Sequence, residues 1–335
     1  MNPTWISALD KPSNPQPQES STERSDGTVG NAVSIVMVTY YTGPVLFEAI
    51  EAVLSQDGLY ELILVDNGNP PEVVAQIERR TAKNDRLIRR SGHGNIGFAA
   101  GCNLGAKSAH AEHLFLLNPD CILPPGSLRV LLKEGIGRPR PWMLGGRLMN
   151  PDGSEQRGAR REILTPWIAF VETFRIDRLA SDHPYFKHFN RNASLVPTET
   201  TSVPVISGAC MMLPTEDYWA FGGMDAGYFV HVEDIDFCHR FRKGGGGIFF
   251  VPHVAVLHLR STSMTSPLFI EWHKTRGFIR YFRKNFSGIY PPLFLQLVNV
   301  GILGRFAWKA GSLLARGLFD GLVRKKRNRE LLFRG

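Results

Sequence analysis

Three carboxylates lie within four positions in the stretch VHVEDIDFCHRFRKGGGG, which runs from residue 230 to residue 247. They are Glu233, Asp234 and Asp236, and a histidine stands on either side of them. Like charges this close repel by a few tenths of a kcal/mol even on an exposed helix, and by more where water is scarce. Such a cluster can be a catalytic base, part of a metal site, or only a helix start whose acids interact with the helix dipole.

Alternating strand and helix patterns precede this cluster. VSIVMVT (33–39), YELILVD (60–66) and HLFLLN (113–118) are short apolar runs typical of strands buried on both faces. Helical spacing of apolar residues separates them, first over 44–56 and then in PPEVVAQIERRTAK. The alternation predicts an α/β fold with a doubly wound, mostly parallel sheet. In such sheets ligands bind beyond the carboxyl ends of the strands.

Polar residues follow the predicted strands where ligands would bind: Thr39, Tyr40, Asp66, Asn67, Asn118 and Asp120. Turn formation alone explains any single one of these strand ends. Three such ends, joined by the Gly-rich SGHGNIGFAAGCNLG (91–105), favour a nucleotide site, because backbone N–H groups in such a loop can approach phosphate. The loop matches neither GxGxxG after the first strand nor GxxxxGK[ST], which argues against a Rossmann dehydrogenase and a P-loop enzyme.

Composition and charge bound the class of protein. With 335 residues, 43% of them hydrophobic, the chain can bury a sizeable core. The four cysteines form no CxxC pair, which argues against zinc and a disulfide framework and predicts a reducing cytosol. Residues 1–31 contain no apolar run, so they predict a disordered leader and no signal peptide. Residues 271–335 hold 14 Lys and Arg against three acids, whereas the whole chain carries only +8. This asymmetry predicts an anionic partner for the C-terminal part.

The basic C-terminal part has its own pattern. Residues 291–319 are apolar but interrupted at helical spacing by Arg305, Lys309 and Arg316, and they lack the run of about 20 uncharged apolar residues that a spanning helix needs. We expect a basic amphipathic helix lying on the membrane, followed by RKKRNRE as an electrostatic clamp. The alternative is a helix pair packed on the catalytic domain with its charges solvated. The chain shows no nucleic-acid motif and no interleaved aromatic-basic repeat, so we predict no nucleic-acid partner.

Between Val33 and Ser263 the chain resembles family 2 glycosyltransferases, particularly the rhamnosyltransferase-like branch that builds bacterial surface polysaccharides. The resemblance is carried, in order, by VSIVMVTYY, LILVDNGNP, GNIGFAAGCNLG, FLLNPDC, ISGACMML, FGGMDAGYFVHVEDIDFCHRFRKGG and VPHVAVLHLRSTS. It implies a GT-A fold, a nucleotide-sugar donor, a divalent cation (Mg²⁺ or Mn²⁺) and an inverting mechanism.

The resemblance also implies roles for individual residues. Asp234 would be the catalytic base with Glu233 beside it, and repulsion from Glu233 and Asp236 would raise its pKa. The metal would be held by Asp120 and His258, more weakly than usual because Asn118 replaces the first acid of the DxD motif. The residues that would bind the nucleotide-sugar are Thr39, Tyr40, Asp66, Asn67, Asn95, Gly97, Asn103, Asn118 and Asp120.

The expected organisation is a leader (1–31), a GT-A catalytic domain (32–265) and a basic amphipathic region (266–335). The domain divides into a nucleotide-binding half (32–125) and an acceptor half (126–265). We expect an inverting hexosyltransferase on the cytoplasmic face of the cell membrane, acting on a free or polyprenyl-linked saccharide. dTDP-rhamnose, UDP-hexoses and UDP-galactofuranose remain candidate donors. The alternative is a non-catalytic GT-A-like subunit of a polysaccharide assembly complex, which binds a sugar or a partner.

Overall fold

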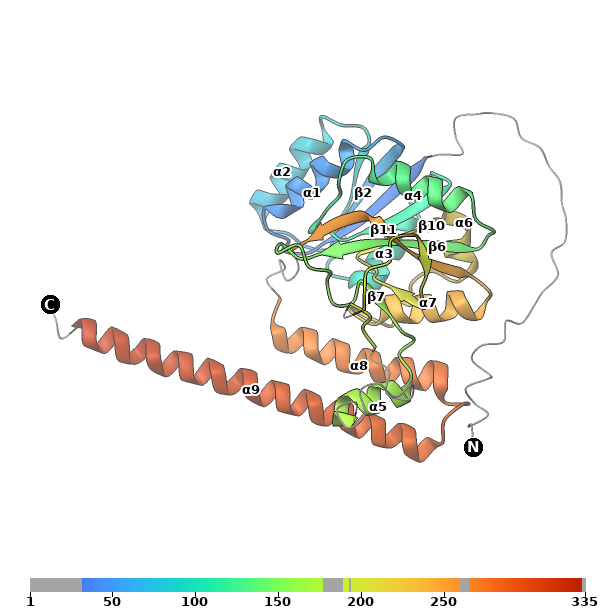
Figure 1. Ribbon diagram of the computed structural model, residues 1–335. Coiled ribbons are helices and arrows are strands. Elements are labelled where there is room, and N and C mark those ends of the chain that lie inside the picture. The colour runs from blue at the N-terminus through green and yellow to red at the C-terminus, as the bar shows by residue number, and fades with distance from the viewer. Residues whose placement is uncertain (1–31, 177–188, 193, 260–264, 333–335) are drawn as a thin grey trace, which may run out of the picture. The chain divides into compact units, whose positions relative to one another are not determined.

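A computed structural model of the protein describes residues 32–176, 189–192, 194–259 and 265–332 (Figure 1). The chain divides into two compact units. The sheet unit comprises the described residues up to Leu164 and those between 189 and 259, and the helical unit comprises those from Thr165 to 176 and from Thr265 onward. The leader predicted for residues 1–31 lies outside the described residues.

The sheet unit is built on one large mixed sheet, with strand order β3-β2-β1-β4-β10-β6-β11-β5 and β8 paired to β11. β1 pairs in parallel with β2 and β4, β2 with β3, and β6 with β11, whereas β10 runs antiparallel to both β4 and β6. The strands are β1 Val33–Thr39, β2 Leu59–Asp66, β3 Leu87–Arg90, β4 His113–Leu117, β5 Cys121–Ile122, β6 Trp142–Met149, β8 Thr201–Ser202, β10 Cys210–Pro214 and β11 Gly247–His258. A separate small sheet pairs β7 Arg160–Arg161 with β9 Val205–Ile206.

Helices flank the large sheet (Figure 1): α1 Val45–Leu54, α2 Pro71–Thr81, α3 Phe98–Ala106, α4 Ser127–Ile136, α6 Thr215–Ala220 and α7 Glu233–Lys243. Ile35 and Met37 of β1 belong to the core that α1 and α4 complete, whereas the alternate residues Val36 and Val38 lie against α3. Gly101 and Gly105 make that second contact close, because a Cβ on either would come within 3 Å of a valine side chain. The sheet is therefore buried on both faces, and this packing holds its strands, and so their ends, in place.

The predicted fold class is confirmed, and the first three predicted strands correspond to β1, β2 and β4. Two segments differ from what their sequences alone predict. The polar, Gly-rich pattern from residue 144 onward predicts turns, whereas residues 142–149 form a strand, β6. IFFVP and VAVLHL have the pattern of two separate strands, whereas they belong to a single strand, β11, with an irregular register between Val251 and Ala255.

The helical unit consists of α5 Pro166–Phe174, α8 Pro267–Phe286 and α9 Pro292–Leu332. Aromatic rings join α5 to α9, since Phe294 lies 5.5 Å from Phe170 and 6.3 Å from Trp167 between ring centroids. α5 lies within the range 126–265 of the predicted acceptor half, and it contacts α9 and belongs to the same compact unit as α8 and α9. Among the helices that the structure describes, none is both long enough and apolar enough to cross a membrane.

Candidate active site

The strand directions bring most of the predicted site residues to one edge of the sheet. β1, β2 and β4 run in parallel, and β11 runs the same way, because β10 is antiparallel to β4 and β6 while β6 is parallel to β11. Their carboxyl ends therefore share one edge, where Thr39, Asp66, Asn118 and His258 follow or end the strands. Glu233 begins α7 near the same edge, since the next residue, Asp234, accepts a hydrogen bond from Gly208, just before β10.

Asp66 at the end of β2 is buried and fully engaged. Its Oδ2 accepts two hydrogen bonds from the Arg89 guanidinium, at 2.7 and 3.1 Å. Its Oδ1 accepts one from the side chain of Asn69 at 2.7 Å and one from the backbone N–H of Gly68 at 3.1 Å. These four contacts use about all of the acceptor positions that a carboxylate has.

Asn67 connects the β2 end to the Gly-rich loop. Its Nδ2 donates to the carbonyl of Gly97 at 3.0 Å, and Asn95 Oδ1 accepts the backbone N–H of Gly97 at 3.1 Å. Gly97 has a φ of 84° and lies so close to Phe229 that a Cβ would sit 2.5 Å from the Phe229 carbonyl oxygen. Only glycine fits this turn, so the loop is held against the segment that leads to α7.

Thr39 and Tyr40 line the beginning of the same edge. The Thr39 hydroxyl is buried and lies 3.0 Å from the Thr42 hydroxyl. The half-buried Tyr40 ring lies beside Gly68 and contacts the ring of Tyr41 edge to face at 4.9 Å.

Asn103 lies apart from this group. Its Oδ1 accepts hydrogen bonds from the Tyr218 hydroxyl at 2.6 Å and from the backbone N–H of Met224 at 3.0 Å, and its Nδ2 donates to the Met224 carbonyl at 2.7 Å. These contacts make Asn103 a bridge between α3 and the turn after α6, within the fold.

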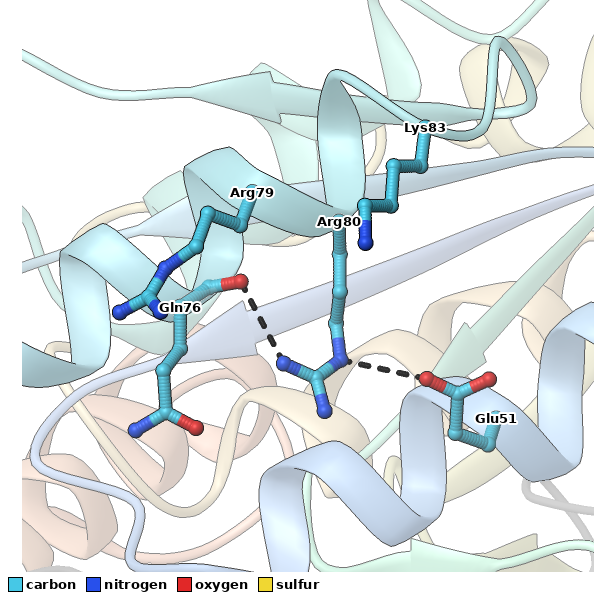
Figure 2. A pocket seen from close by; sticks show the side chains of 5 residues that line it. All are labelled: Glu51, Gln76, Arg79, Arg80 and Lys83. Carbon is cyan, nitrogen blue, oxygen red and sulfur yellow. Dashed lines mark hydrogen bonds and ion pairs between the residues drawn. The ribbon is translucent and has the colours of Figure 1, made fainter.

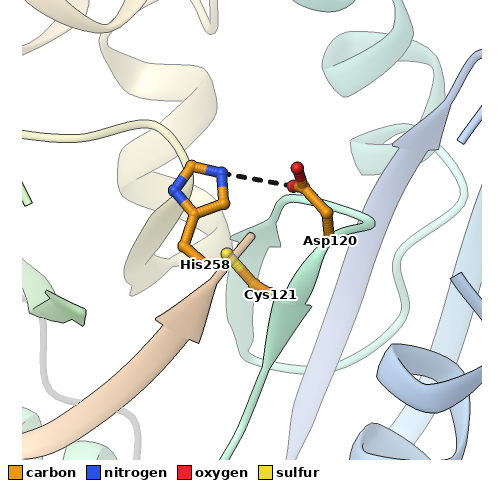
Figure 3. Close-up of side chains that lie close together, drawn as sticks. All are labelled: Asp120, Cys121 and His258. Atoms are coloured by element: carbon orange, nitrogen blue, oxygen red, sulfur yellow. Dashed lines mark ion pairs between the residues drawn. The ribbon is translucent and has the colours of Figure 1, made fainter. Parts of the chain in front are cut away.

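A second group gathers where β4 and β11 end. Asp120, Cys121 and His258 are buried, and their potential ligand atoms lie within 4.8 Å of one another (Figure 3). His258 Nε2 is 3.2 Å from Asp120 Oδ1 and 3.3 Å from Asn118 Nδ2. Burial, with a smaller contribution from Asp120, raises the pKa of the Cys121 thiol well above its ordinary value, so this sulfur stays protonated.

This second group fits a divalent cation. Asn118 Oδ1 is buried and has no hydrogen-bond partner among the described residues, a costly arrangement unless a ligand uses that lone pair. With Asp120 and His258 it offers a carboxylate oxygen, an imidazole nitrogen and an amide oxygen. Mn²⁺ and Mg²⁺ accept such oxygen donors, and Mn²⁺ tolerates the nitrogen better.

The carboxylate cluster begins α7, as the helix-start interpretation predicts. His231 and Val232, directly before it, both have positive φ, at 66° and 76°. A left-handed conformation is costly for a β-branched residue such as valine, and strain of this kind is found at functional sites. The turn places Glu233 and Asp234 together in the protein interior.

The negative charge of Asp234 is compensated by an arginine and by backbone N–H groups of the protein. Its Oδ2 accepts from Arg161 at 2.6 Å and from the Gly208 N–H at 3.0 Å, and its Oδ1 accepts from the Ile235 N–H at 2.8 Å. Burial acts to raise the pKa of this carboxyl, but the charge and hydrogen bond of Arg161 outweigh burial and lower the pKa below its ordinary value. The expectation of a raised pKa at Asp234 is therefore wrong, because it did not include Arg161.

Glu233 has the raised pKa instead. Burial, and then the charge of Asp234, raise its pKa to about 8. Its Oε2 is buried and has no hydrogen-bond partner among the described residues. The pair thus holds one proton near neutral pH, on Glu233, while Asp234 is ionised. Asp236 is separate from both, since it accepts from Arg240 at 2.8 Å.

A hollow of about 370 Å³ lies on the surface between α1 and α2 and contains none of the predicted site residues (Figure 2). Its walls carry Arg79, Arg80, Lys83 and Gln76, and Arg80 is paired with Glu51 at 3.2 Å. The hollow is a mostly basic part of the surface, away from the strand ends that carry the predicted site.

Sequence reasoning missed three residues of the site. Arg89 holds Asp66, Arg161 holds Asp234, and Gln156 lies 2.9 Å from Nδ1 of His258. Arg161 and Gln156 belong to SEQRGARRE, a polar segment that resembles a solvated loop. Its adjacent arginines, Arg160 and Arg161, were the one available signal.

Comparison with known proteins identifies the family to which the sequence is similar and the solved structures that share its fold. Residues 34–220 match the family model described as "Glycosyl transferase family 2". The chain is similar to the N-acetylglucosaminyl-diphospho-decaprenol L-rhamnosyltransferase of Mycobacterium tuberculosis, with 27% identity over 245 residues, which is 70% of this chain and 78% of that protein.

Two solved structures are similar in fold. GalNAc-T7 with UDP, GalNAc and Mn²⁺ gives a TM-score of 0.56 at 17% identity, over 77% of this chain and 48% of that one. Mannosyltransferase PcManGT from Pyrobaculum calidifontis, in complex with GDP-Man and Mn²⁺, gives 0.51 at 16% identity, over 95% and 86%. These likenesses confirm the predicted GT-A type of fold.

Proposed function

Because this chain belongs to glycosyl transferase family 2, we propose that it transfers a sugar from a nucleotide-sugar donor to a saccharide acceptor with inversion at the anomeric carbon. One observation carries the proposal. A cation-ligand group (Asn118, Asp120, His258) and an ionised, buried Asp234 with its proton-bearing neighbour Glu233 lie at the same edge of the sheet. Transfer needs a positive charge near the leaving diphosphate and a carboxylate to take a proton from the acceptor hydroxyl.

The donor lies along the carboxyl ends of β1, β2 and β4 in this proposal. Its contacts are the nucleotide-sugar-binding residues named from the sequence. Asn103 differs from the others, because it contributes indirectly by holding α3 in place. Asp66 accepts from the N3–H of the base. Because its acceptor positions are already filled, the side chain of Asn69 must turn away to open one position on Oδ1. Besides Asp66, this side chain contacts the Thr39 hydroxyl at a long 3.4 Å.

Asp120 and His258 hold the cation, Mg²⁺ or Mn²⁺, with Asn118 contributing its amide oxygen. A cation held there would offset the negative charge that develops on the leaving diphosphate. The single carboxylate of this group makes the cation site weaker than one with two acids.

Asp234 is the general base in this proposal. It is ionised near neutral pH and it is held in place by Arg161 and Gly208. Its carboxylate takes the acceptor's hydroxyl proton as the acceptor oxygen bonds to the anomeric carbon and the bond from that carbon to the diphosphate breaks. General-base assistance contributes on the order of 10²–10⁴-fold.

L-Rhamnose from dTDP-rhamnose is the donor we propose first, since the mycobacterial relative is named as an L-rhamnosyltransferase. A thermal-shift screen of dTDP-, UDP- and GDP-sugars, with and without Mg²⁺ or Mn²⁺, tests it, because a ligand that binds the native state raises the melting temperature. We expect a selective rise with dTDP-rhamnose, and product formation on a polyprenyl-diphosphate-linked saccharide. Binding without turnover on any acceptor would favour a non-catalytic subunit. No response to any nucleotide would contradict the donor proposal.

We also propose that the protein works peripherally on the cytoplasmic face of the cell membrane. The mycobacterial relative's name specifies a decaprenol-linked acceptor. On α9 the large exposed apolar side chains fall within an arc of about 140° at 100° per residue: Leu293, Leu297, Val300, Leu303, Trp308 and Leu314. This apolar stripe shares its helix with the basic RKKR sequence, a combination that suits an anionic bilayer.

Vesicle co-sedimentation tests this membrane proposal. Wild type should bind vesicles containing anionic lipid and not neutral ones, and Trp308→Glu, at a side chain 80% exposed, should release most of it. Leu195→Glu is the matched control, because Leu195 is 94% exposed but belongs to the sheet unit, and it should leave binding unchanged. A wild type that stays in the supernatant with anionic vesicles would refute membrane association.

A further inference from the structure

Gln156 is a buried glutamine whose amide orientation is determined by its surroundings. It is 2% exposed, and its Nε2 faces two carbonyl oxygens, those of His258 at 2.5 Å and Met149 at 3.4 Å. A carbonyl oxygen can only accept, so the nitrogen of the amide must be the atom that faces them. The amide oxygen of Gln156 therefore faces the other way, toward the imidazole of His258.

That orientation determines which nitrogen of His258 carries the proton. Gln156 Oε1 lies 2.9 Å from His258 Nδ1. Since an amide oxygen has no hydrogen to give, Nδ1 must donate, and the neutral ring is the Nδ1–H tautomer. The other nitrogen, Nε2, then carries the lone pair of the ring. It lies 3.3 Å from Asn118 Nδ2, a long contact that a bound cation would replace, and 3.2 Å from a carboxylate oxygen of Asp120.

We infer that Gln156 is a positioning residue that holds His258 in the Nδ1–H tautomer and so presents Nε2 as a ligand to the divalent cation. The inference rests on the cation site of the proposed function. A histidine ligand needs a hydrogen-bond partner for its other nitrogen, and loss of such a partner typically costs roughly 10–100-fold in metal affinity. Gln156 supplies that partner from the segment before β7, far from β11 in sequence.

The same segment also holds the other half of the site. Five residues after Gln156, Arg161 pairs with Asp234, while the intervening Arg160 is fixed by a buried ion pair with Glu155 at 2.9 Å. Successive side chains of a strand point to opposite sides, so Arg160 and Arg161 of β7 serve different partners. Residues 155–161 thus orient His258 and Asp234 from one short, anchored piece of chain.

The test uses the full-length protein, with Gln156→Leu compared with Gln56→Leu. Gln56 is an equally buried glutamine, 3% exposed, whose amide bonds only to backbone groups, namely the carbonyls of Ala52 and Pro124 and the N–H of Leu128, and to no histidine. Both variants lose similar hydrogen bonds, so any general loss of stability is matched. Mn²⁺ affinity is measured by electron paramagnetic resonance of the free ion, without substrate or turnover. We expect roughly 10–100-fold weaker binding for Gln156→Leu, and no change for Gln56→Leu.

The tautomer is measured separately, by long-range ¹⁵N–¹H correlation in histidine-labelled protein, with His258→Ala to assign the signal. Wild type should show Nδ1–H and Gln156→Leu should lose that preference, whereas Gln156→Glu, which keeps an acceptor at this position, should retain it. An Nε2–H tautomer in wild type, or a Gln156→Leu variant with unchanged tautomer and unchanged Mn²⁺ affinity, would overturn the inference. Wild type that shows Nδ1–H but binds no Mn²⁺ would remove the cation from the proposed function and would uphold the role of Gln156 in setting the proton.

Discussion

The two halves of the site are buried to a similar degree, yet they satisfy their buried polar groups in different ways. Around Asp234 the protein supplies its own cation, Arg161, together with two backbone N–H groups. In the other half, His258 Nε2 lies 3.2 Å from Asp120 Oδ1, and the buried Asn118 Oδ1 has no hydrogen-bond partner among the described residues. A carboxylate paired with an arginine is held in its ionised form, whereas a buried amide oxygen without a hydrogen-bond partner is available to a bound cation. The first arrangement suits a base and the second a cation site.

Asp234→Asn should break the first half alone. We expect the turnover number to fall by about 10²–10⁴-fold, because an amide cannot take the acceptor proton, with nucleotide-sugar affinity within a few-fold of wild type. Initial-rate kinetics and donor titration measure the two. Asp217→Asn is the control, since Asp217 of α6 also pairs with an arginine, Arg140, at 2.7 Å. Lost donor affinity in Asp234→Asn would instead make Asp234 part of the donor site.

Asp120→Asn should break the second half. The variant keeps size and loses the only charge of the cation group, so Mn²⁺ affinity should fall by more than the roughly 10–100-fold expected for a supporting residue such as Gln156. Paramagnetic resonance of free Mn²⁺ measures this directly. The acidic limb of the pH–rate profile, which reports Asp234, should not move when Mn²⁺ is saturating. A limb that moves would show that the two halves are electrostatically coupled.

Arg161→Gln should remove the positive charge that the protein supplies to Asp234. Without the guanidinium the pKa of Asp234 rises, so the base becomes protonated at a higher pH. The acidic limb of the kcat/KM profile therefore moves to higher pH, by about one pH unit for every tenfold fall in the acid dissociation constant of Asp234. Mn²⁺ affinity should be unchanged. Arg160→Gln is the matched variant, because it breaks the adjacent buried ion pair without touching Asp234, and its acidic limb should stay in place.

Glu233→Gln has the smallest expected effect, and it acts on stability. The folded protein holds the Glu233 proton up to a pH of about 8, whereas the unfolded chain releases it near the ordinary value of 4.5. Wild-type stability therefore falls as pH rises between these values, by at most about 1.4 kcal/mol per pH unit. The variant does not titrate, so its advantage in melting temperature should grow from pH 5 to pH 8 and then level off.

Catalysis by Glu233 would give a different pattern. If Glu233 were the base, the wild-type rate would rise with pH through about 8, and Glu233→Gln would lose as much activity as we predict for Asp234→Asn.

Local sequence patterns predicted the main parallel strands and the polar residues at their ends. VSIVMVT coincides with β1, and the strand-end residues Thr39, Asp66 and Asn118 share an edge because parallel strands must place their ends together. β6 escaped detection because its centre is Gly145-Gly146, which usually indicates a turn. There the glycines serve packing, since a Cβ would come within 2.8 Å of Ile206 and 2.9 Å of the Val254 carbonyl oxygen.

The electrostatics of the site could not be predicted in the same way. Arg161 and Asp234 are 73 residues apart, and Gln156 and His258 are 102 apart. No periodicity links such pairs, because only the folded chain brings them into contact. The sequence therefore indicated which carboxylates to consider, and assigned the raised pKa to Asp234, whereas the structure assigns it to Glu233.

The left-handed valine at the start of α7 sets a limit on engineering the protein. Val232 has a φ of 76°, a conformation that costs on the order of 1–3 kcal/mol for such a residue. Val232→Gly would relieve that strain. Yet Val232 is only 2% exposed, so glycine would also remove buried apolar contacts and loosen the backbone that immediately precedes the two carboxylates. Position 232 is therefore a poor target for raising heat resistance, because the same valine packs the interior and fixes the start of the helix that carries the proposed base.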